Sequence, residues 1–213
     1  MKNLLLALAL TASTATATPT APRLYITGEV GGAIVDQADA LRSLVSQGHT
    51  TVKLVINSPG GSVYAGLQFI NAMIAAQAKG VKIKCYVGGM AASMAFQIFA
   101  HCNKRYATRY ALLLFHPATT NVYGNARELA YTADRLATIE GALIPVLTEA
   151  LKMDKDLFMY HYKNQTLWTA EELSEVSPNF LQILSDIPGR AIWSAPEAKK
   201  MFKKLVKRRG SKK

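Results

Sequence analysis

The feature that most restricts the fold is an alternation of short apolar segments with amphipathic stretches between residues 24 and 116. Residues 52–56 and 81–87 are apolar and rich in β-branched side chains, a composition typical of buried parallel strands. Residues 33–47 have apolar side chains at helical spacing, and Gly80 follows a second such stretch as a helix C-cap residue. We expect strands at residues 24–26, 52–56, 81–87 and 112–115, and helices at 33–47, 64–79 and 91–100.

This alternation predicts an α/β fold. Strands that alternate with helices form repeated βαβ units, in which neighbouring strands pair in parallel. A longer helix is expected from Gly124 and Asn125 to about Met153, with a kink at Pro145. The sequence shows no internal repeat, and residues 154–192 are less periodic than the residues before them.

The first 17 residues have the order of residue types found in a signal peptide. Lys2 gives a positive start, residues 4–10 form an apolar run, and Ala15-Thr16-Ala17 fits a cleavage site. An exported or periplasmic protein is therefore expected, and a cytoplasmic protein with an unstructured leader or a propeptide is the alternative. The length of 213 residues suffices for one domain with a sizeable core. We divide the chain into a leader (1–22), a folded domain (23–192) and a basic tail (193–213).

The basic character of the chain is concentrated in its tail. The formal net charge is +11, yet residues 199–213 contain nine of the 25 Lys and Arg residues and no Asp or Glu. A solvated tail that favours solubility is the plainest interpretation, and an acidic partner is another. Specific nucleic-acid binding is not expected, because Phe202 is the only aromatic residue in this segment. No run of about 18 apolar residues occurs, so no transmembrane helix is expected.

The two cysteines, Cys85 and Cys102, lack neighbouring ligands at metal-binding spacing, so a zinc site is not predicted. We expect buried free thiols. A disulfide between them would require an oxidising compartment, and their separation in space does not follow from the sequence. No motif in the chain implies a metal ion or an organic cofactor.

The strongest local motif surrounds Ser93. A predicted strand leads through Gly88 and Gly89 into a run of small residues at the start of a helix. We expect the two glycines to form the turn between them. Small neighbours allow a substrate backbone to approach, and a helix N-terminus favours negative charge near the serine oxygen. A serine in an Ala-rich helix is by itself usually a packing residue, and a nucleophile also needs a base within reach.

Two further motifs could complete such a site. Asn57 to Ser62 form a glycine-containing turn after a buried strand, where backbone N–H groups could hold an oxyanion. His116 follows the predicted strand 112–115, and the carboxyl end of a parallel strand is where ligands usually bind. Separately, each motif is more simply interpreted as a tight turn or a partly buried histidine.

Together and in this order, the motifs resemble the proteolytic subunit of the Clp protease, a family with the ClpP/crotonase fold. The resemblance covers about residues 23–187 and implies repeated βαβ units with a long handle helix. Gly124-Asn125-Ala126 resembles the start of that helix. The other matching stretches are Ile56-Asn57-Ser58-Pro59-Gly60-Gly61-Ser62-Val63, Gly89-Met90-Ala91-Ala92-Ser93-Met94, Phe115-His116-Pro117 and Thr169-Ala170-Glu171-Glu172.

The resemblance implies a role for each matching residue. Ser93 would be the nucleophile, His116 the general base, and the N–H groups of Gly61 and Met94 the oxyanion hole. The turn at Gly60 and Ser62 would bind a substrate peptide as an added strand. The family also implies peptide or unfolded-protein substrates and a homo-oligomeric ring. A ring ATPase partner is implied only for a cytoplasmic protein.

The chain departs from the family at the third member of the triad. The family has an Asp where this chain has Gln165, and neither Gln165 nor the adjacent Asn164 is a carboxylate. An amide can orient the histidine, as in Cys-His-Asn peptidases, whereas loss of the carboxylate in a Ser-His-Asp triad lowered kcat about 10⁴-fold. A distant acid such as Asp186 is a further alternative. Residues 193–198 offer another alignment that would place the third position near Arg190, which could not orient a histidine, so we prefer Gln165.

Three functions are consistent with these motifs. The first is a serine endopeptidase that uses Ser93, His116 and a backbone oxyanion hole. The second, motivated by the missing carboxylate, is a catalytically weak or silent ring subunit. The third is a crotonase-type enzyme acting on acyl thioesters, which does not need a framed Ser-His pair and is therefore disfavoured.

Overall fold

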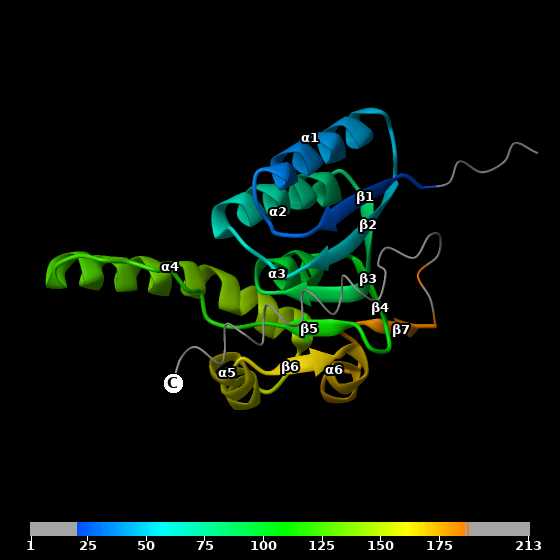
Figure 1. The fold of residues 1–213 in the computed structure, drawn as a ribbon. Helices are drawn as coiled ribbons and strands as arrows, with labels where there is room; N and C mark the ends of the chain where they lie inside the picture. Colours follow the sequence, from blue (N-terminus) through cyan, green and yellow to red (C-terminus); the bar gives the residue numbers. More distant parts are fainter. Residues whose placement is uncertain (1–20, 186, 188–213) are drawn as a thin grey trace, which may run out of the picture.

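The computed structural model describes residues 21–185 and 187, which form a parallel sheet with helices packed around it (Figure 1). Five strands lie in the order β1-β2-β3-β4-β7 and pair in parallel, while β5 pairs with β3 and β6 pairs antiparallel with β5. The predicted α/β fold is confirmed. The strands are β1 (Arg23–Thr27), β2 (Thr51–Ser58), β3 (Lys82–Ala92), β4 (Lys104–Thr108), β5 (Leu112–Leu114), β6 (Leu167–Thr169) and β7 (Gln182–Leu184).

The helices follow from local signals in the sequence. The first helix buries Ile34, Ala38 and Leu41, which recur at helical spacing. The longest helix begins with a capping box, in which Asn125 and Glu128 satisfy each other's backbone N–H groups. The helices are α1 (Ala33–Ser46), α2 (Val63–Ala78), α3 (Met94–Ala100), α4 (Ala126–Leu151), α5 (Lys155–Asn164) and α6 (Ala170–Val176).

The long helix α4 projects well beyond the rest of the described chain (Figure 1). It is one continuous helix through Pro145, and the predicted kink stays a prediction. Only Leu147 and Leu151, near its end, are buried. None of the helices in residues 21–185 is long and apolar enough to cross a membrane.

The role of Gly88 and Gly89 was predicted wrongly. They do not form a turn, because β3 continues through them to Ala92 and the helix begins at Met94 rather than near residue 91. At these glycines β3 changes its partner from β4 to β5, and its pairing with β2 shifts between Ile56 and Ser58. Glycine suits such a bulge because it tolerates a bent backbone and close neighbours.

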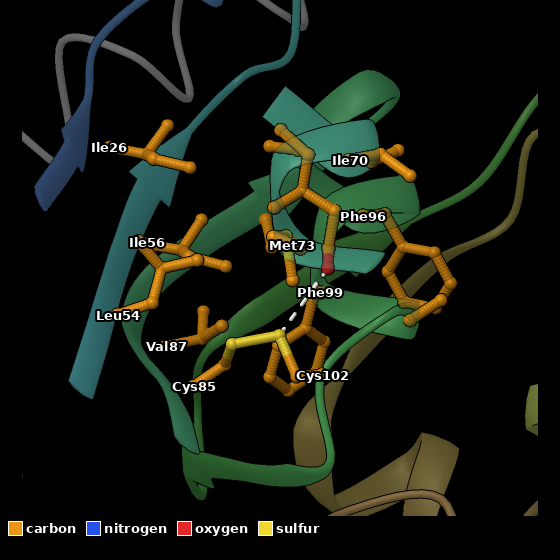
Figure 2. Packing of buried hydrophobic residues seen from close by; sticks show 14 of the residues in the cluster. Ile26, Leu54, Ile56, Ile70, Met73, Cys85, Val87, Phe96, Phe99 and Cys102 are labelled. Atoms are coloured by element: carbon orange, nitrogen blue, oxygen red, sulfur yellow. Dashed lines mark hydrogen bonds between the residues drawn. A yellow bond between two sulfur atoms is a disulfide. The ribbon is translucent and has the colours of Figure 1, made fainter. Parts of the chain in front are cut away.

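The expected free thiols are also a wrong prediction, because Cys85 and Cys102 form a disulfide with a Cα–Cα distance of 6.0 Å. Both cysteines are buried, as predicted. The chain runs out along β3 and returns through α3, which brings the two residues together in the core. Figure 2 shows the pair among apolar side chains that include Val87 and Phe99.

Candidate active site

Ser93 alone makes the transition from β3 to α3. The strand ends at Ala92 and the helix begins at Met94, so the direction change falls on one residue. Its backbone has φ 57° and ψ −125°, a conformation that non-glycine residues rarely adopt and that often occurs at functional sites. A serine on a sharp strand-to-helix turn presents its Oγ to a cleft, as in nucleophile elbows. Ser93 is half-buried.

The glycine turn after β2 lies directly against Ser93. A Cβ added to Gly60 would lie 2.5 Å from the Ser93 Cβ and 2.9 Å from the Met94 nitrogen. Gly60 has φ 90° and Gly61 has φ 150°, so both use backbone freedom that other residues lack. The sequence placed these residues in separate motifs 30 or more positions apart, and the fold brings them together.

Hydrogen bonds to Val30 orient the glycine turn so that the Gly61 N–H points away from Val30. The Val30 N–H donates to the Gly60 carbonyl and the Ser62 N–H donates to the Val30 carbonyl, each at 2.8 Å. In this parallel bridge, Val30 pairs across Gly61, so the Gly61 N–H points to the opposite side. Met94 is the first residue of α3, where the N–H has no partner within the helix.

Ser62, predicted to bind substrate, has a structural contact. It is the N-cap of α2, and its Oγ accepts a hydrogen bond from the Ala65 N–H at 3.3 Å. Its side chain therefore stabilises the helix that follows the glycine turn. A substrate contact could come from its backbone or from the exposed side of its hydroxyl.

His116 lies two residues beyond β5, next to the end of β3. Ala92 pairs with Leu114, and the Ser93 N–H donates to the Leu114 carbonyl at 2.8 Å. The His116 Nδ1 lies 2.6 Å from the Pro117 carbonyl oxygen. Because that oxygen can only accept, Nδ1 carries the hydrogen and Nε2 of the neutral ring is the basic nitrogen.

Gln165 lies at the corresponding end of the next strand. The β5–β6 ladder ends with Leu114 opposite Leu167, so His116 and Gln165 each lie two residues beyond its last pair. Gln165 ends α5 with φ 51° and is exposed. The neighbouring Asn164 is also exposed, and its Nδ2 donates to the Tyr160 carbonyl at 2.8 Å. Asp186 lies outside the described residues.

Two residues that the sequence assigned to the glycine turn, Asn57 and Ser58, instead end β2 and have buried polar side chains. The Asn57 Oδ1 accepts from the Met90 N–H at 3.2 Å, and the Ser58 Oγ accepts from the Gly60 N–H at 3.1 Å. Both side chains are buried. Asn57 thus fills the bulge in β3, and Ser58 holds the start of the turn. Their direct continuation of the β-branched run at residues 52–56 was the available signal that they belong to β2.

Glu140 was not predicted from the sequence. Its Oε1 accepts a hydrogen bond from the Ala118 N–H at 2.9 Å, which ties the middle of α4 to the segment after His116. The sequence gives little sign of this contact, because Glu140 accepts from the backbone of a residue 22 positions away.

Comparison with known proteins places these residues in a family context. The Clp protease family profile matches residues 23–176. The ATP-dependent Clp protease proteolytic subunit 1 of Mycobacterium tuberculosis is 33% identical over 121 residues, which are 55% of this chain and 59% of that protein. The chain therefore spans under two thirds of that relative. Subunit 2 of Corynebacterium efficiens is 27% identical over 156 residues, covering 71% of this chain and 77% of that protein.

Proposed function

This chain belongs to the Clp protease family, and from that premise we propose that it is a serine endopeptidase with Ser93 as nucleophile and His116 as general base. The observation that carries the proposal is the backbone of Ser93. Its conformation at the β3–α3 junction is one that costs a non-glycine residue free energy, and such strained residues cluster at active sites.

The proposed reaction follows from the positions of the groups. His116 Nε2 takes the proton of Ser93 Oγ as that oxygen attacks the peptide carbonyl carbon. The resulting oxyanion is bound by the N–H groups of Gly61 and Met94. His116 then protonates the leaving amine, and a water molecule hydrolyses the acyl-enzyme by the same steps in reverse.

We propose that Gly60 and Ser62 bind the substrate backbone beside this oxyanion hole, and that Gln165 lies beside the His116 ring as a neutral hydrogen-bonding group. Peptides or unfolded proteins are the proposed substrates, because only an extended segment can pair with the turn as an added strand. No cofactor takes part in this proposal.

The alternative function is a catalytically weak or silent ring subunit. Gln165 favours it, because an amide cannot carry the negative charge that stabilises the imidazolium in a Ser-His-Asp triad. Hydrolysis of small fluorogenic peptides by the purified protein, with Ser93→Ala as control, separates the two functions. Turnover that is lost in the Ser93→Ala variant supports the peptidase, and no turnover in either protein supports the silent subunit.

We further propose an exported, homo-oligomeric protein. The signal-peptide-like start supports export, and the Cys85–Cys102 disulfide is consistent with an oxidising compartment. A ring ATPase would be a partner only in the cytoplasm. N-terminal sequencing of the expressed protein should begin at Thr18 after export, whereas a cytosolic protein that retains Met1 would contradict this location.

A further inference from the structure

One peptide group connects His116 to a carboxylate. The His116 Nδ1–H donates to the Pro117 carbonyl oxygen at 2.6 Å. The N–H of the same peptide group belongs to Ala118 and donates to the Glu140 Oε1 at 2.9 Å. The hydrogen bonds therefore run in one direction, from the imidazole through the peptide to the carboxylate.

We propose that Glu140 is a positioning residue for His116 and acts through the Pro117–Ala118 peptide, in a chain that has Gln165 where the family has an Asp. The inference rests on the proposed function of His116 as a general base. Gln165 remains a neutral neighbour of the ring in this account, and Glu140 supplies the negative charge.

The chemistry of the peptide group makes this transmission effective. An anionic acceptor on the N–H polarises the amide and makes its carbonyl oxygen a stronger acceptor, since connected hydrogen bonds reinforce one another. The Pro117 oxygen then holds Nδ1–H more firmly and stabilises the imidazolium that forms during proton transfer. A direct carboxylate does the same without an intervening group.

The surroundings hold Glu140 in place. Glu140 is half-buried on α4, and the Tyr162 hydroxyl of α5 also hydrogen-bonds to it. Burial is the main reason that the pKa of Tyr162 is raised, and the charge of Glu140 adds to the effect. Tyr162 therefore stays neutral and acts as a donor to the carboxylate throughout the pH range in which an imidazole titrates.

An aromatic stack links this tyrosine to the residue that precedes His116. The ring of Tyr162 stacks on Phe158 at 5.6 Å, and Phe158 stacks on Phe115 at 5.3 Å. Phe115 directly precedes His116 in the chain. The carboxylate, its hydroxyl donor and the histidine segment thus belong to one packed unit, so the hydrogen-bond chain is held on both sides.

The test is the pair Glu140→Gln and Glu149→Gln in the fluorogenic peptide assay. The glutamine at position 140 keeps an oxygen for the Ala118 N–H and removes only the charge, whereas Glu149 is an exposed residue of the same helix. Glu140→Gln should lower kcat about tenfold, the effect of one charge-assisted hydrogen bond, with KM unchanged. Glu149→Gln should match the wild type.

The pH profile distinguishes positioning from a structural role. In Glu140→Gln the imidazolium loses a stabilising charge, so the acid limb of the kcat/KM profile should move to lower pH. A variant with lower kcat but an unmoved acid limb would overturn the inference, as would one that equals the wild type. If Glu140→Gln does not fold, Tyr162→Phe takes its place and should lower kcat with the same displacement of the limb.

The outcomes separate this inference from the proposed function. A wild-type protein without activity overturns both, whereas an active wild type with an equally active Glu140→Gln variant overturns the inference alone. The tautomer of His116 tests the hydrogen-bond chain independently of activity. The chain has only four histidines, and ¹⁵N NMR distinguishes their ring nitrogens. His116 protonated at Nδ1 in the neutral ring is the expected result, and protonation at Nε2 would contradict the hydrogen-bond chain.

Discussion

The residues around Ser93 depend on one another through their backbones. Ser93 adopts a positive φ, and Gly60 approaches it closely enough that no side chain could be added at position 60. The N–H of Ser93 is hydrogen-bonded to Leu114, which leads into His116. The position of Ser93, the proposed nucleophile, thus depends on main-chain contacts with two other segments, and small changes there should affect activity more than stability.

We predict that Gly60→Ala lowers kcat/KM about 100-fold or more, because the added Cβ would displace Ser93 and Met94, and small displacements at a reacting group cost that much. Gly80→Ala is the matched control. Gly80 has a similar φ, 84° against 90°, but nothing lies within 4 Å of its added Cβ. It should lose about 1 kcal/mol of stability in urea unfolding and keep its kcat/KM. Equal activity in the two variants would contradict the proposed contact.

Among the elements, β3 and α3 form the unit that carries Ser93. The Cys85–Cys102 disulfide closes this unit at its base, across a sequence separation of 17 residues. Arg105 caps the far end of α3, since its side chain donates to the carbonyls of Ala100 and Cys102. The disulfide and Arg105 thus hold β3 and α3 together at the end opposite Ser93.

Reduction of the disulfide should lower the free energy of unfolding by about 3 kcal/mol, the value expected for a closed loop of this length. Urea unfolding with and without dithiothreitol measures the difference. The double variant Cys85→Ala/Cys102→Ala should not respond to the reductant. If a thiol reagent labels both cysteines in denatured, unreduced protein, the pairing is wrong.

The pH dependence of stability should include a contribution from His101, at the C-terminal end of α3. Burial lowers the pKa of His101, and the hydrogen bond to the Gln97 carbonyl opposes this only in part. Below about pH 6.5 the unfolded chain binds this proton more readily than the folded protein. The free energy of unfolding should therefore fall as the pH decreases from that value. His101→Asn should reduce this slope between pH 7 and 5, and an identical slope in both proteins would contradict the assignment.

Elements whose signals lie in residues close together in the chain could be predicted from the sequence. The strand predicted at 52–56 and the helices predicted at 33–47 and 64–79 rest on local signals, and the structure has β2, α1 and α2 at these positions. Gly88 and Gly89 were read wrongly because glycine suits both turns and bulges, and the exchange of β4 for β5 decides between them.

Several features could not be predicted because they depend on distant contacts. The strand β4 has the sequence Lys-Arg-Tyr-Ala-Thr and lacks an apolar run. Its place between β3 and β7 makes it a strand. The disulfide and the Glu140–Ala118 contact likewise join segments that only the folded chain brings together. In the site, the residue types were predictable, whereas the peptide connection of His116 to Glu140 was not.

For the whole molecule, the projecting helix α4 is the part that the described chain leaves least covered. Leu129 and Tyr131 are 45% and 64% exposed. In the proposed oligomer, a second copy of the chain would cover part of this helix, and Leu129 is the side chain chosen to test that contact. The helix also holds Glu140, so the proposed assembly would involve the same element that contacts the histidine segment.

We predict a native mass well above the 23.2 kDa of one chain, measured by sedimentation or native mass spectrometry. Leu129→Glu should lower that mass by placing a charge in the contact. Leu157→Glu is the control, because Leu157 is also partly exposed, at 38%, but lies on α5. A monomeric wild type, or equal masses for the two variants, would contradict assembly through α4.

Labelling with a fluorophosphonate probe is the most direct measurement of the central claim, because the probe reacts only with an activated serine. The account predicts that the wild-type protein is labelled at Ser93 and that Ser93→Ala and His116→Ala are not. If the wild type is not labelled, or if Ser93→Ala is labelled equally, Ser93 is not the nucleophile of this protein.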